Sequence, residues 1–92
     1  MPGLGKGDIR IVILQRGWVM VGKYSQDGPR CSLGSAYVIR VWGTKNGIGE
    51  LALNGPTDGT KLDSTNGRVD FHELTVIATI QCNSKKWESI CR

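Results

Sequence analysis

The sequence predicts a mainly β protein, namely a small antiparallel barrel of the SH3-like or OB-like kind with room for one short helix. Short runs rich in Val, Ile, Thr and aromatic residues recur along the chain. Pairs of Gly, Asn, Asp and Pro separate these runs, and the 13 glycines are scattered, not periodic. Five to seven short strands joined by tight turns are typical of small barrels, in which closure of the sheet removes exposed edges.

A single domain is expected from the length of 92 residues, because one core of this size leaves nothing over for a second. Hydrophobic content of 39% and charged content of 22% lie in the globular range. We expect residues 8–92 to form this β-rich domain. Residues 1–7, with three glycines and a proline, are expected to form a flexible N-terminus.

The first two expected strands form a hairpin. Residues 9–14 (IRIVIL) are rich in β-branched side chains, and residues 18–24 (WVMVGKY) follow after a three-residue turn. Gly22 interrupts the second strand and predicts a bulge or a close crossing there. Asp27-Gly28-Pro29 then predicts a turn, since glycine tolerates positive φ and proline fixes the φ that follows.

The middle of the chain is harder to assign. Residues 31–33 are expected to form a short strand. For residues 36–42 (AYVIRVW) the β-branched and aromatic content favours a strand, while Ser35 as an N-cap and Gly43 as a terminator allow a two-turn helix. We prefer the strand.

Two polar loops and a short strand come next. Residues 43–49 (GTKNGIG) and 54–61 (NGPTDGTK) are expected to be loops, and residues 50–53 between them a strand with its two leucines on one face. The last third of the chain contains the strongest hairpin signal, Asn66-Gly67, before a strand at 68–71.

The longest strand is expected over residues 74–82 (LTVIATIQC), with alternate apolar side chains on one face. In the tail that follows, Trp87 and Ile90 are expected to cover the open end of the core.

The net charge indicates which binding partners the protein prefers, and the cysteine content indicates the cellular compartment. Twelve Lys and Arg against eight Asp and Glu give a net charge of +4, a mild preference for anionic partners without a dense basic arm for nucleic acid. Cys31, Cys82 and Cys91 are odd in number, lack paired spacing and follow no secretory leader, which favours reduced thiols in the cytoplasm. No apolar run is long enough to span a membrane.

The residues that could carry catalysis or bind metal do not form a known motif. His72 is the only histidine, and Val76 stands where an H-E-x-x-H motif needs its second ligand. The cysteines lack zinc-knuckle spacing, and a nucleophile elbow is missing. We therefore expect a non-enzymatic protein without metal or cofactor.

The glycine loops are the best candidate for a binding site. Small residues expose successive backbone N–H groups, and Lys45 adds charge, although the loop is neither a Walker A loop nor a Rossmann fingerprint. We predict an anion or nucleotide site in one concavity that offers charge, a stacking face and hydrogen-bond donors; its residues are Arg40, Trp42, Thr44, Lys45, Asn54 and Thr57. The alternative is a pair of structural glycine turns with Trp42 in the core.

Several short runs along the chain carry a resemblance; they are Gly17-Trp18-Val19, Val38-Ile39-Arg40, Trp42-Gly43-Thr44, Gly49-Glu50-Leu51, Gly55-Pro56-Thr57, Leu62-Asp63 and His72-Glu73-Leu74-Thr75. In these runs residues 9–87 resemble a family of short uncharacterised phage and prophage proteins without an assigned activity. A second basic residue often follows the Arg40 position in that family, and Val41 stands here instead.

The resemblance implies a small phage accessory protein in the host cytoplasm. Our leading hypothesis is a binding protein, expected to be a homo-oligomer, that sequesters an anionic, nucleotide-like signalling ligand and so counters host defence. One alternative is a protein–protein interaction module that occludes a host protein. Another is a barrel that binds single-stranded nucleic acid, which the modest charge makes less favoured.

Overall fold

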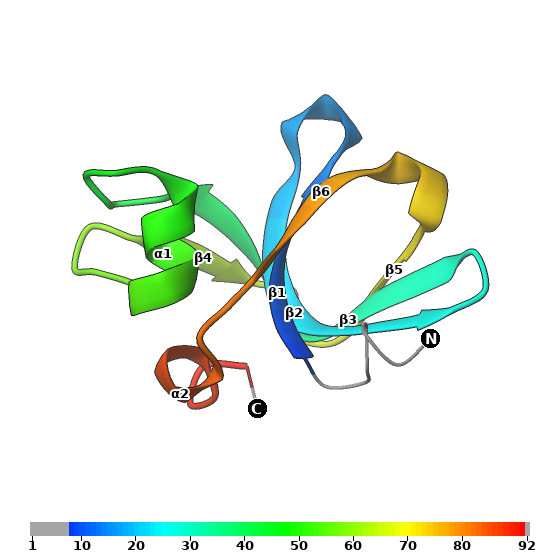
Figure 1. Ribbon diagram of the computed structural model, residues 1–92. Coiled ribbons are helices and arrows are strands. Elements are labelled where there is room, and N and C mark those ends of the chain that lie inside the picture. Colours follow the sequence, from blue (N-terminus) through cyan, green and yellow to red (C-terminus); the bar gives the residue numbers. More distant parts are fainter. Residues whose placement is uncertain (1–7, 92) are drawn as a thin grey trace.

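The computed structural model describes residues 8–91 and consists of one six-stranded antiparallel sheet with two short helices (Figure 1). The expected mainly β fold is confirmed. The strands are β1 (Asp8–Leu14), β2 (Val19–Asp27), β3 (Arg30–Val41), β4 (Lys61–Ser64), β5 (Val69–His72) and β6 (Val76–Gln81). The helices are α1 (Ile48–Asn54) and α2 (Ser84–Trp87), with 3-10 turns η2 (Gln15–Gly17) and η3 (Glu73–Thr75).

The strand order is β4-β3-β2-β1-β6, and β5 also pairs with β3. The sheet curls strongly (Figure 1), but within residues 8–91 no pairing joins β6 to β4 or β5, so the sheet is open. The flexible terminus expected for residues 1–7 lies outside the described residues, as does Arg92.

The predicted first hairpin is confirmed. Strands β1 and β2 pair from Asp8↔Tyr24 to Ile13↔Val19, and the turn is made by Arg16 and Gly17 with φ of 67° and 80°. The close crossing predicted at Gly22 is also confirmed, because a Cβ built there would lie 2.9 Å from the backbone oxygen of Gly34.

Strand β3 runs unbroken through both segments that the sequence left uncertain, so the strand interpretation of residues 36–42 is confirmed up to Val41 and the helix alternative is wrong. A bulge at Ser35, with φ of 49°, shifts the register of β2 against β3. The extra residue keeps Cys31 and Leu33, before the bulge, on the same face as Ala36, after it.

The strand expected at residues 50–53 is wrong, because these residues belong to α1. The apolar residues that decide it are Ile48, Leu51 and Ala52, whose spacing of three and four residues places them together on one side of a helix. Leu53, which alternation would have paired with Leu51, is 61% exposed.

The hairpin predicted at Asn66-Gly67 is also wrong. Strands β4 and β5 do not pair with each other; both run antiparallel to β3, end to end along its edge. Ala36 bridges the break, because its N–H donates to the oxygen of Gly67 at 2.9 Å and its oxygen accepts from the N–H of Thr65 at 3.1 Å.

The long strand expected over residues 74–82 is shorter than predicted. Leu74 and Thr75 belong to η3, where the His72 side chain accepts from the Leu74 N–H, and β6 covers only Val76–Gln81. The longest strand is β3, with 12 residues.

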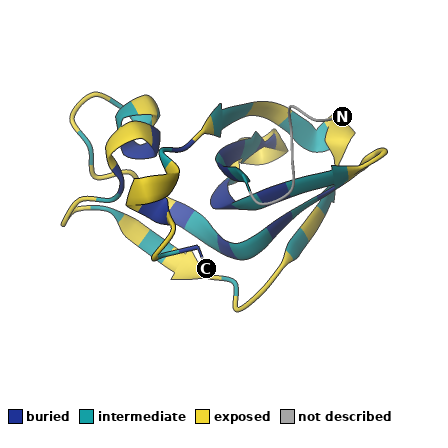
Figure 2. Cartoon of the chain, turned by 60° about the horizontal axis from the view of Figure 1, so that its bottom comes forward, coloured by how far each residue is buried: buried dark blue, intermediate teal, exposed yellow. Residues whose placement is uncertain are grey.

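Both faces of the sheet bury apolar side chains, but against different partners. The inner face curls on itself around residues from β1, β2 and β3 such as Val12, Tyr24 and Leu33. The outer face carries Ile11, Val21 and Ile39, which are covered by α1 and α2 (Figure 2). Its cover includes Trp87, which is fully buried; the sequence predicted a covering role for this residue at an open end of the core but did not decide its burial.

In the described part of the chain, no helix is long and apolar enough to cross a membrane.

Candidate functional site

The outer face of the sheet has a second half that the helices do not cover. Here the tip of the β2–β3 hairpin and the neighbouring β5 border an open cavity of about 600 Å³. We call it the hairpin groove, and its lining residues are Ser25, Gln26, Asp27, Arg30, Cys31, Ser32, Arg68, Asp70, Phe71 and His72.

The strand register sets the polar side chains of the groove in two rows. Asp27 pairs with Arg30, which pairs with His72 on its other side. One step along the strands, Ser25 pairs with Ser32, which pairs with Asp70. Because side chains alternate between the faces of a strand, these six point away from the core that holds Tyr24, Leu33 and Phe71.

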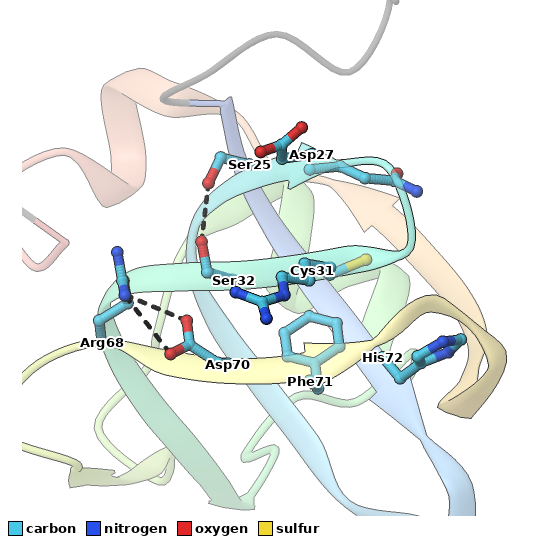
Figure 3. A pocket seen from close by; sticks show the side chains of 10 residues that line it. Ser25, Asp27, Cys31, Ser32, Arg68, Asp70, Phe71 and His72 are labelled. Carbon is cyan, nitrogen blue, oxygen red and sulfur yellow. Dashed lines mark hydrogen bonds and ion pairs between the residues drawn. The ribbon is translucent and has the colours of Figure 1, made fainter.

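Two contacts in the second row are well formed (Figure 3). The hydroxyl oxygens of Ser25 and Ser32 lie 2.7 Å apart, joining β2 to β3. Arg68 places two nitrogens on the carboxylate of Asp70, with Nε 3.0 Å from Oδ1 and a terminal nitrogen 3.4 Å from Oδ2. This forked geometry holds both side chains along β5.

The side chains of the first row, Asp27, Arg30 and His72, make fewer contacts with one another. Arg30 is exposed and makes no ion pair or side-chain hydrogen bond with any residue of the described chain. The imidazole of His72 accepts at Nδ1 from the Leu74 N–H at 3.1 Å, which fixes the ring and leaves Nε2 available as a donor. The groove therefore combines an oriented imidazole with a cation that has no counter-ion in the described part of the chain.

The strands beneath the groove are held by packing on the inner face. The rings of Tyr24 and Phe71 are tilted with their centroids 6.4 Å apart. The Tyr24 hydroxyl donates to Oε1 of Gln26 at 3.1 Å and lies 3.3 Å from the sulfur of Cys31. Burial, and next the contact with Cys31, raises the pKa of Tyr24 to about 12. The hydroxyl thus stays protonated and keeps the hairpin tip in place.

The predicted glycine-loop site lies at the opposite, helix-covered end of the molecule. Its two loops do meet, since the hydroxyl of Thr57 donates to the oxygen of Gly43 at 2.5 Å and that of Thr60 to the oxygen of Trp42 at 2.6 Å. The hydroxyl of Thr44 donates to the oxygen of Gly47 at 2.6 Å. These three hydroxyls are therefore engaged in holding the loops.

The other predicted residues are exposed around these loops. Arg40 forms an ion pair with Asp63, 3.0 Å from Nε to Oδ2. Trp42 is 42% exposed, so it is not part of the core. Lys45 and Asn54 are exposed, and Asn54 ends α1. None of the six predicted residues lines the hairpin groove or a second cavity of about 370 Å³ beside the break between β4 and β5; their role in binding stays a prediction.

Sequence reasoning missed the hairpin groove. A signal was present on the second arm of the Asp27-Gly28-Pro29 turn, where Arg30 and Ser32 alternate with Cys31 and Leu33. Alternation of this kind indicates strands with one polar face. Only the third strand, β5, turns that face into a groove, and its residues are 36 to 42 positions away along the chain from the β3 residues with which they pair.

Residues 8–91 contain no cluster of three or more His, Cys, Asp or Glu side chains arranged to hold a metal ion. A scan against protein-family models gave no match, and a search of curated proteins gave no significant match. The candidate site is therefore described by its side chains alone: it is a polar groove on the sheet, lined by cations, carboxylates and hydroxyls.

Proposed function

We propose that this chain is a non-enzymatic binding protein that holds an anionic, nucleotide-like small molecule in the hairpin groove. The observation that carries the proposal is Arg30, an exposed guanidinium at the centre of a cross-strand row without a counter-ion among the described residues. A phosphate group supplies the missing partner in forked geometry, which is the preferred contact of arginine with phosphate.

The remaining groups of the groove suit the rest of such a ligand. The paired hydroxyls of Ser25 and Ser32 and the Nε2 of His72 add donors for phosphate oxygens. The carboxylates of Asp27 and Asp70 accept from ribose hydroxyls or an exocyclic amine. A volume of about 600 Å³ falls in the range of small-molecule sites.

The resemblance to short phage proteins supports the biological setting of the proposal. A protein that binds without turnover acts in proportion to its concentration, so sequestration of a host signalling nucleotide is the action that fits it. Counter-defence is the consequence we propose for such sequestration.

A thermal-shift screen tests the proposal. The purified protein is heated with linear nucleotides, cyclic di- and trinucleotides, ADP-ribose derivatives and a short single-stranded oligonucleotide. A ligand at a thousandfold its dissociation constant stabilises the folded state by about 4 kcal/mol, which gives a clear rise in midpoint. We expect one small nucleotide to produce this rise in the wild type and none in Arg30→Ala.

Two results would contradict the proposal. An unchanged midpoint with every small nucleotide would remove the ligand class. A rise with the oligonucleotide alone, declining steeply with salt, would instead indicate single-stranded nucleic-acid binding.

A protein-binding module is the second candidate function, and exposed apolar side chains near the glycine loops favour it. Val41 is 46% and Trp42 42% exposed, next to each other at the end of β3. A host protein retained on the purified chain, and released by Trp42→Ala but not by nucleotides, would distinguish this function from small-molecule binding.

A further inference from the structure

The two open edges of the sheet are built differently, and β6 forms one of them. Among the described strands β6 pairs only with β1. Residues 74–82 contain neither a charged residue nor a proline. Edge strands of soluble proteins are usually protected by charges, prolines or covering segments, because their free N–H and C=O groups can pair with another strand.

The backbone groups that β6 leaves unpaired can be assigned from its register. The N–H of Cys82 donates to the oxygen of Ile9 at 3.0 Å, so Cys82 points its backbone groups toward β1. In an antiparallel strand, successive residues direct their N–H and C=O groups to opposite sides. Ile80 therefore directs these groups toward β1, while Thr79 and Gln81 direct theirs to the open edge. No strand of residues 8–91 therefore pairs with the outward backbone groups of β6.

Three large apolar side chains lie exposed around the same end of the sheet. Ile77 in β6 is 65% exposed, and Leu74 in the preceding turn is 78% exposed. Trp18, 53% exposed, is connected to this end because its oxygen accepts from the N–H of Leu14, the residue that pairs with Val76. An occupant of the β6 edge would remove part of this surface from water.

The opposite edge is protected. Its strands β4 and β5 have four residues each and are separated by the break at residues 65–68. They carry Lys61, Asp63 and Asp70, so a strand laid on this edge would meet charges of both signs. Among the described residues, one edge of the sheet is thus protected and the other is not.

We propose that the open edge of β6 binds a second copy of the chain, whose β6 pairs antiparallel with β6 across a two-fold axis and extends the sheet into the second copy. Self-pairing sets two strands without charged residues of their own against each other, and the nearest cation is Arg10 of β1, whose guanidinium donates to Thr79 at 3.3 Å. Head-to-tail pairing would instead place β6 on the short, charged, interrupted edge of β4 and β5. An interface based on one six-residue strand is small, and we expect a dimer that dissociates in the micromolar range.

Sedimentation velocity over a range of concentrations tests the dimer. We expect the wild type to shift from monomer to dimer, and Ile77→Lys to remain a monomer because it places two lysines on the paired edge. Leu53→Lys is the matched control: Leu53 is 61% exposed but lies on α1, and this variant is expected to dimerise as the wild type does. Far-UV circular dichroism verifies that both variants fold.

Gln81→Pro tests the proposed hydrogen bonds between the two β6 strands without adding charge. The variant removes an N–H that faces the open edge, a place where edge strands tolerate proline, and we expect at least a tenfold weaker dimer. A wild type that stays monomeric at every concentration overturns the proposal, as does an Ile77→Lys variant that dimerises normally or a Leu53→Lys variant that does not.

Amide hydrogen exchange distinguishes the two-fold arrangement from a head-to-tail one. Exchange at Thr79 and Gln81 is expected to slow as concentration rises. The outward amides of β5, those of Asp70 and His72, should keep the same rate, because the Glu73 N–H donates to Pro29 at 2.8 Å and alternation turns these two away from β3. Concentration-dependent protection on β5 would refute the two-fold pairing.

Discussion

The two halves of the outer sheet face differ, although β2 and β3 run through both. In the covered half the strands present Val21 and Ile39, and α1 and α2 bury them together with Trp87. In the uncovered half the same strands present Ser25, Arg30 and neighbouring polar residues, which border the hairpin groove. The covered half therefore stabilises the fold by burying apolar side chains, whereas the uncovered half exposes polar side chains, and there we propose that the ligand binds.

The glycine loops belong to the covered half. They flank α1, and their threonine hydroxyls bond to the backbone of Trp42 and Gly43. These bonds hold the two loops together beside α1. We therefore expect substitutions in the covered half to lower the free energy of unfolding, and substitutions in the hairpin groove to lower the affinity for the ligand.

The largest expected effect is the loss of Trp87. Its side chain is fully buried, and its indole N–H is shared between the oxygens of Leu51 at 3.2 Å and Ala52 at 3.3 Å. Trp87→Ala should lower the free energy of unfolding by about 3–5 kcal/mol, measured by urea denaturation. Trp18→Ala, at a residue that is 53% exposed, is the control and should cost about 1 kcal/mol or less. Equal losses would contradict the assignment of Trp87 to the core.

The next largest effect is expected at Gly43, where the two loops cross. Gly43 has φ of 71°, and a Cβ there would overlap the Gly59 carbonyl carbon and the Thr60 nitrogen. Gly43→Ala should destabilise by about 2–3 kcal/mol. Gly49→Ala is the matched control: Gly49 lies in α1 with nothing near its Cβ position, so alanine should stabilise by up to about 1 kcal/mol. The same sign for both variants would argue against a structural role of the crossing.

Alkaline pH should weaken the covered half through its thiols. Burial raises the pKa of Cys82 to about 12 and of Cys91 to about 11, from an ordinary value of 9.0. The unfolded chain releases these protons above pH 9 while the folded chain keeps them, so this stability is complete below pH 9 and is lost as pH rises through the raised pKa values.

The measurement is urea denaturation at several values between pH 8.5 and pH 10. We expect a loss of about 1 kcal/mol per pH unit for the two thiols together, less than the full linkage value because solvent screens part of the effect. In the double variant Cys82→Ala, Cys91→Ala the slope should decrease, and an unchanged slope would rule out the thiols as its source.

The smallest effect on stability is expected in the groove. Arg30 is exposed and has no counter-ion within residues 8–91, and both partners of the ion pair between Arg68 and Asp70 are exposed. Arg30→Ala and Asp70→Ala should each change the free energy of unfolding by no more than about 0.5–1 kcal/mol. A loss as large as that of Gly43→Ala would mean that the groove residues support the fold.

The sequence predicted correctly those elements that depend on residues close together in the chain. The β1–β2 hairpin follows from two β-branched runs and a turn, and the close crossing at Gly22 from a glycine inside a strand. The helix at Ile48–Asn54 was missed because a short apolar run fits periods of both 2 and 3.6 residues. The Asn66-Gly67 signal was misread because whether two strands pair with each other or with a third depends on distant residues.

The hairpin groove was missed for the same reason. The glycine loops are conspicuous within one stretch of sequence, but the bonds that engage Thr57 with Gly43 connect residues 14 positions apart. The groove instead combines a polar hairpin with a strand near the end of the chain, and neither part is distinctive alone.

The most direct test of this comparison uses two arginines of one strand. Arg30 and Arg40 both lie on β3 and are both exposed, but Arg40 has Asp63 as a counter-ion and belongs to the predicted glycine-loop site, whereas Arg30 lines the groove. Calorimetric titration should use the nucleotide that stabilises the wild type most. We predict that Arg30→Ala weakens binding at least a hundredfold and that Arg40→Ala leaves the affinity within about threefold. The reverse result, with affinity lost in Arg40→Ala and kept in Arg30→Ala, would contradict the proposal and indicate that the ligand binds at the glycine loops.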